Sequence, residues 1–119
     1  GRTDLVITQN GALTRLYQNK EARPGLRVRV NAGPANPTGV GSVVRLLWEG
    51  GKMGPARLIA AGSGYWSQDS AVQVLGSPKE IQSTHLEVRW PGGKNTRTEI
   101  PKDAKEIHVG PDGKLIPSK

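Results

Sequence analysis

The densest group of chemically capable side chains lies in one glycine-flanked loop, residues 62–70, called the aromatic loop below. Two aromatic rings stand there beside hydroxyl, amide and carboxylate groups, a mixture that can stack on a sugar or a peptide and hydrogen-bond its edges. The alternative is a structural corner, in which the rings plug the end of a thin sandwich and the polar groups hold the turn. The predicted ligand-contacting side chains are Tyr65, Trp66, Ser67, Gln68 and Asp69.

Arg89 and Trp90 are the second part of the predicted binding surface. They lie at the end of a strand that enters a Pro-Gly-Gly loop at residues 91–93. If those three residues form the loop of a hairpin, Glu87 lies opposite Arg97 in a favourable cross-strand pair. A two-residue loop would instead place Arg97 against the apolar face of the hairpin.

Catalytic chemistry has little support in the sequence. His85 and His108 fall on outward faces of predicted strands, and the local sequence pairs neither with a nucleophile and an orienting acid. The absence of cysteine removes disulfides and thiolate zinc sites. The glycine-rich loop at residues 33–41 lacks the lysine of a phosphate loop and precedes a strand, so it is interpreted as architecture. We expect no enzyme, no catalytic residue, no metal and no cofactor.

The charge of the chain suggests a class of partner. A formal net charge of +7 could attract nucleic acid, an acidic polysaccharide or an acidic neighbouring domain. The cations are spread along the chain, and aromatic platforms are few, which argues against dedicated nucleic-acid binding. No stretch approaches the roughly 18 apolar residues of a membrane span, so we expect no membrane insertion.

The elements that must position these side chains are short strands. Runs rich in β-formers recur about every ten residues, each closed by glycine, proline or asparagine. An Asn-Gly pair predicts a hairpin over residues 5–17, alternation predicts a strand over 26–30, and an apolar run predicts a central strand within 42–49. The fold class expected is all-β, a small β-sandwich or partly open barrel of about 7–10 short antiparallel strands. Ser77, Pro78 and Glu80 predict at most one short helical turn.

Four motifs occur in order along the chain: residues 10–29, 36–46, 62–68 and 86–93. Together they resemble the ASPIC/UnbV domain. The resemblance implies an all-β module without enzymatic activity, found at the C-terminal end of secreted or cell-surface proteins built on FG-GAP (VCBS-like) propeller repeats. It implies an extracellular, cell-surface or periplasmic location, and the protein's own upstream propeller repeats as a partner.

The resemblance also divides the chain. Residues 1–119 are expected to form a single β domain, in which residues 1–19 are similar to the tail of a preceding propeller repeat. Residues 20–109 would be the ASPIC/UnbV-like core, and residues 110–119 a C-terminal tail. Asp4 would be the last carboxylate of a calcium loop whose earlier ligands lie upstream, so no bound calcium is expected.

Two segments depart from the family pattern. Residues 74–77 read Val-Leu-Gly-Ser where the family commonly has a Phe-Gly-Leu-Gly-like stretch, and the segment after Lys105 matches poorly. The leading hypothesis is a β module that binds a carbohydrate or protein ligand, or packs on its own propeller, through the aromatic loop and the Arg89-Trp90 hairpin. The alternatives are a purely structural cap of the propeller and charge-driven binding of polyanions.

Overall fold

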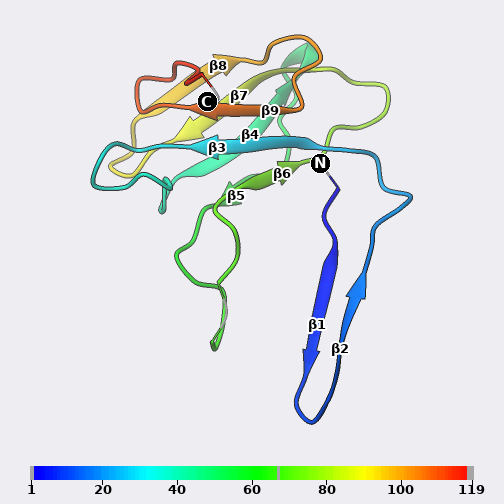
Figure 1. Cartoon of the computed structure of the whole chain (residues 1–119). Helices are drawn as coiled ribbons and strands as arrows, with labels where there is room; N and C mark the ends of the chain where they lie inside the picture. Colours follow the sequence, from blue (N-terminus) through cyan, green and yellow to red (C-terminus); the bar gives the residue numbers. More distant parts are fainter. Residues whose placement is uncertain (1, 67, 118–119) are drawn as a thin grey trace.

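The computed structural model describes residues 2–66 and 68–117, and this part of the chain forms strands joined by turns and loops (Figure 1). One 3-10 turn, η1, spans Glu49–Gly51. No helix in the described ranges is long and apolar enough to cross a membrane. The strands are β1 (Leu5–Gln9), β2 (Ala12–Tyr17), β3 (Leu26–Val30), β4 (Val43–Trp48), β5 (Arg57–Leu58), β6 (Gln73–Leu75), β7 (Ser83–Arg89), β8 (Asn95–Glu99) and β9 (Glu106–Val109).

The strands form three sheets, ordered β1-β2, β6-β3-β9 and β5-β4-β7-β8. The two larger sheets contribute side chains to one shared apolar cluster, which is the arrangement of a β-sandwich. The predicted all-β sandwich is therefore confirmed. One pairing differs from the antiparallel expectation, because β3 and β9 run parallel. These strands lie far apart in the sequence, and the whole four-stranded sheet forms in the connection between them, as a parallel pair requires.

The core is small and mostly aliphatic. In β3, β4 and β7 alternate residues point inward, as period two requires. Leu86, Val88 and Trp90 share one inward face, and Trp90 is 5% exposed. The buried apolar residues are Val28, Val30, Val44, Leu46, Ile59, Leu75, Leu86, Val88, Trp90, Ile107 and Val109.

The β7-β8 hairpin has the register expected from its three-residue loop. The Trp90 amide donates to the Lys94 carbonyl at 2.8 Å, and Glu87 pairs with Arg97 across the two strands. A second arginine, Arg45 of β4, reaches the same carboxylate from the other side. The outer face of this sheet is therefore organised around one partly buried acid between two guanidinium groups.

The helical turn does not form where the sequence predicts it. The Ser77 hydroxyl is hydrogen-bonded to the Ser83 hydroxyl, so it does not cap a helix, and residues 79–80 form only a turn. The 3-10 turn lies instead at Glu49–Gly51, where Gly50 and Gly51 adopt positive φ angles of 74° and 75°. Glycine permits that backbone without steric cost, so the chain reverses there.

The loop at residues 33–41 is held by its own side chains. The Asn36 side-chain Nδ2 donates to the Val40 carbonyl at 2.8 Å, and its Oδ1 accepts the backbone N–H of Val40 at 2.9 Å. At Gly39, φ is 67° and an added Cβ would lie 2.3 Å from a methyl carbon of Val30. The conformation and the close approach both require glycine, which gives this loop a structural account.

Candidate binding surface

Two segments project from the sandwich, and in Figure 1 both extend below it. One is the β1-β2 hairpin, in which every strand residue is exposed. The predicted hairpin is confirmed, and its turn contains Gly11 with φ 73°. The other is the aromatic loop, which descends from β5 in Figure 1. The base of each segment is close to the edge of the sandwich.

The β1-β2 hairpin carries apolar side chains on both faces. Leu5 is paired with Tyr17 on one face, and Val6 with Leu16 on the other. An isolated two-stranded hairpin is marginally stable in water, and its open edges and apolar faces are features that proteins usually cover. The exposed large apolar side chains of this segment are Leu5, Val6, Ile7, Leu13, Leu16 and Tyr17.

Polar contacts close the base of the hairpin. The Asp4 carboxylate accepts the Asn19 amide at 2.8 Å, and the Asn19 side chain donates to the Thr3 carbonyl at 3.3 Å. The Asn19 side-chain oxygen also accepts the Ala22 amide at 3.0 Å. Asp4 therefore has a structural partner in this chain, and the hairpin leaves the sandwich from a hydrogen-bonded base.

The aromatic loop presents its two rings to solvent. Tyr65 is 91% exposed and Trp66 90%, so the structural-corner alternative is wrong. The rings meet edge to face with centroids 5.8 Å apart, a favourable geometry for an aromatic pair. Trp66 has a φ of 53°, the left-handed region that non-glycine residues rarely occupy. Such outliers cluster at ligand and switch sites.

The other predicted site residues do not all join the loop. Ser67 lies outside the described residues, whereas Gln68 and Asp69 are exposed on the loop itself. Arg89 is exposed in a separate shallow hollow on the outer face of the four-stranded sheet. Trp90 belongs to the core, where its Nε1–H donates to the Thr96 hydroxyl at 2.8 Å. Because Trp90 continues the inward face of β7, it is removed from the candidate surface.

A cleft separates the bases of the two projections, and sequence reasoning did not find it. Its volume is about 730 Å³, and we call it the basic cleft. Three arginines from distant segments line it, Arg2, Arg27 and Arg57, and Asp69 is the one acidic residue among the lining residues described. The alternation in residues 26–30 does predict a solvent-exposed face of β3 that carries arginines. The local sequence, however, gives no sign that Arg2 and Arg57 lie close together.

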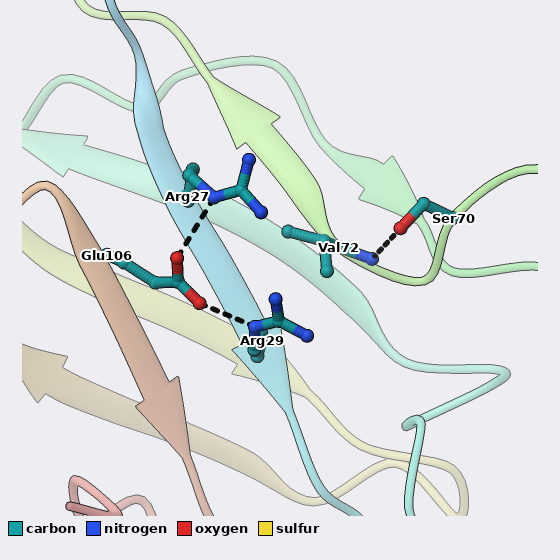
Figure 2. Close-up of polar contacts among 5 residues, drawn as sticks. All are labelled: Arg27, Arg29, Ser70, Val72 and Glu106. Atoms are coloured by element: carbon teal, nitrogen blue, oxygen red, sulfur yellow. Dashed lines mark hydrogen bonds and ion pairs between the residues drawn. The ribbon is translucent and has the colours of Figure 1, made fainter. Parts of the chain in front are cut away.

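Arg27 and Arg29 are fixed on the outer face of β3 by a shared carboxylate (Figure 2). The Arg27 Nε lies 2.9 Å from one oxygen of Glu106, and the Arg29 Nε lies 2.5 Å from the other. Hydrogen bonds from Arg29 and Arg27 hold the pKa of Glu106 below its ordinary value. Two guanidinium groups share one carboxylate, so this face keeps a net positive charge at neutral pH.

The described side chains do not assemble a metal centre. No group of three or more His, Cys, Asp or Glu residues in the described ranges could hold an ion. His85 lies on β7 and His108 on β9, strands of two different sheets. The structure instead places exposed apolar side chains on the two projections and arginines in the basic cleft.

One protein-family model matches most of the chain. The family model for ASPIC and UnbV matches residues 32–114, a segment that begins after the first of the four motifs and contains β4 to β9. No curated protein and no solved structure matches the chain. The family match covers well over half of the sequence and most of the sandwich, and on this basis the chain belongs to the ASPIC and UnbV family.

Proposed function

We propose that this chain is a non-enzymatic extracytoplasmic module that binds a protein surface through the β1-β2 hairpin and the aromatic loop. The observation that carries the proposal is the concentration of exposed apolar side chains on these two projections, six on the hairpin and two at the loop tip. Contiguous exposed apolar patches on small proteins mark interaction sites. The ASPIC and UnbV family, to which the chain belongs, is not a known catalytic family.

A protein partner suits the hairpin better than a sugar does. Leucine, valine and isoleucine gain by burial against another apolar surface, whereas a sugar ring is recognised by aromatic stacking and convergent hydrogen bonds. The open edges of β1 and β2 also offer backbone groups to a neighbouring sheet. A propeller of FG-GAP/VCBS repeats, the partner implied by the family resemblance, supplies such sheet edges and is the partner we propose.

The experiment measures binding between the chain and a separately produced FG-GAP/VCBS propeller domain by calorimetry. In a Val6→Thr/Leu16→Thr variant, threonine is still compatible with a strand, but the apolar surface of the hairpin becomes smaller. Trp66→Ala removes the indole ring from the aromatic loop. Each is expected to weaken binding about tenfold or more, because a buried apolar side chain contributes roughly 1.5–3 kcal/mol.

The matched control is Met53→Thr, because Met53 is an exposed apolar residue outside both projections. It should leave the affinity unchanged within about twofold. Absence of binding by the unmodified chain, or equal losses in Met53→Thr and the hairpin variant, would contradict the proposal.

A glycan is the second candidate ligand, favoured by the exposed Tyr65 and Trp66 rings beside Gln68 and Asp69. Stacking on a sugar would survive near-physiological salt, whereas attraction of a polyanion by charge would fall steeply with salt. A glycan and polyanion array at two salt concentrations, repeated with Trp66→Ala, separates these cases. Salt-resistant binding that Trp66→Ala abolishes would assign the loop to carbohydrate.

A further inference from the structure

We propose that the basic cleft takes an extended acidic peptide segment, which adds as a strand beside β6 and pairs its carboxylates with Arg27 and Arg57. The inference rests on the proposed function, because the segment would belong to the docked protein. Beyond that function, it specifies that the part of the partner entering the cleft is acidic and extended.

The cleft lies between two open strand edges. In the described sheets β6 pairs only with β3, and β5 pairs only with β4, so each strand has one free edge. Residues of both strands line the cleft, among them Gln73 and Val74 of β6 and Arg57 of β5. An extended chain placed there can satisfy backbone groups of an edge strand, which is the usual mode of β-strand addition.

The charge of the lining selects an acidic occupant. Arg57 has no ion-pair partner among the described side chains, and it faces the cleft together with Arg2 and Arg27. Figure 2 shows the outer nitrogens of Arg27 pointing away from Glu106, which holds only its Nε. Guanidinium groups bind carboxylates in a planar, directional manner, so charge complementarity favours aspartate or glutamate here.

The entrance to β6 is already ordered. The Ser70 hydroxyl accepts the Val72 amide at 3.2 Å, which fixes the chain where the aromatic loop passes into the strand (Figure 2). The cleft volume of about 730 Å³ falls within the range of ligand sites. A sulfated sugar shares the charge of an acidic peptide, but it cannot extend a sheet, so the two strand edges favour the peptide.

The test is an NMR titration of the chain with a six-residue peptide that alternates aspartate and threonine and has blocked ends. The expected result is a shift of the Gln73 and Val74 amides, and binding weakened about tenfold by Arg57→Glu. Lys52→Glu makes the same change of charge at an exposed residue outside the cleft lining. It should change the affinity by less than about threefold.

Two further probes separate strand addition from charge alone. A peptide with proline in place of threonine keeps its carboxylates but lacks those backbone donors, and it should bind much more weakly. A heparin-derived hexasaccharide is the sulfated alternative. The inference is overturned if the aspartate-threonine peptide does not bind, if the proline peptide binds equally well, if Lys52→Glu weakens binding as much as Arg57→Glu, or if the hexasaccharide alone shifts the β6 amides.

Failure of this inference differs from failure of the proposed function. The peptide needs only the cleft, so the Val6→Thr/Leu16→Thr variant should bind it normally while losing the propeller domain. If the unmodified chain binds the propeller domain, the hairpin variant does not, and neither protein binds the peptide, the docking role stands and the acidic segment is ruled out.

Discussion

At the scale of single residues, Glu87 is the one buried acid in the described part of the chain, and it pairs with two arginines. Its side chain is 11% exposed and lies 2.8 Å from the Nε of Arg45 and 3.0 Å from the Nε of Arg97. Burial raises the pKa of this carboxyl, but the hydrogen bonds from Arg97 and Arg45 outweigh it, so the pKa is held below its ordinary value. The ionised form therefore stabilises the folded state.

We predict that Glu87→Gln lowers the free energy of unfolding at pH 7 by about 1–3 kcal/mol, because a charge-assisted hydrogen-bond pair is lost. The contribution is present at neutral pH and is lost as the pH falls from about 4.5 through the lower pKa of the folded state. Urea unfolding of both proteins between pH 3 and 7 measures this. Identical pH dependence in the variant and the unmodified chain would contradict the account.

Gly39 gives a second prediction at this scale. Its positive φ and the 2.3 Å separation between an added Cβ and Val30 leave no room for a side chain. Gly39→Ala should lower the unfolding free energy by about 1–3 kcal/mol. Gly62→Ala is the matched control, since nothing lies within 4 Å of an added Cβ there. Equal melting temperatures for the two variants would show that the loop adapts.

At the scale of elements, the sequence predicts features that depend on neighbouring residues better than contacts between distant segments. Alternation in residues 26–30 gives the arginine face of β3, and the Pro-Gly-Gly loop gives the register of β7 and β8. The parallel pairing of β3 with β9 could not be found, because it joins strands separated by most of the domain. The basic cleft escaped detection for the same reason, since its arginines come from three separate segments.

The local sequence also does not predict whether the aromatic loop points toward the core or into solvent. From the sequence alone, Tyr65 and Trp66 could either be buried in the core or be exposed to solvent. The alternation that predicts burial within a strand is absent from a loop. Trp90 is different, because its inward position follows from the alternation that it shares with Leu86 and Val88. Strand position therefore predicts its burial, although its chemistry suggests a binding residue.

The β1-β2 hairpin gives a prediction at the element scale. Its strand residues are all exposed, so its amides should exchange with solvent much faster than those of β4 and β7 in the isolated chain. Hydrogen exchange followed by mass spectrometry measures the difference. Protection of residues 5–17 equal to that of the β4-β7 pair would show that the hairpin needs no cover.

At the scale of the whole molecule, a small sandwich supports two projections and a basic cleft between their bases. If the proposed docking is correct, the net charge of +7 would favour an acidic partner and speed encounter, and the exposed apolar side chains would hold that partner after contact. Raising the salt concentration should therefore slow association with the propeller domain more than it speeds dissociation. Surface plasmon resonance separates the two rates, and a salt effect confined to dissociation would contradict this division.

The most direct test of the docking role is hydrogen exchange of the chain with and without a separately produced FG-GAP/VCBS propeller domain. Exchange at residues 5–17 and at the tip of the aromatic loop should slow when the propeller is present, and exchange on the outer face around Glu87 should stay unchanged. Exchange that is unaffected at both projections, or protection confined to the outer face, would contradict it.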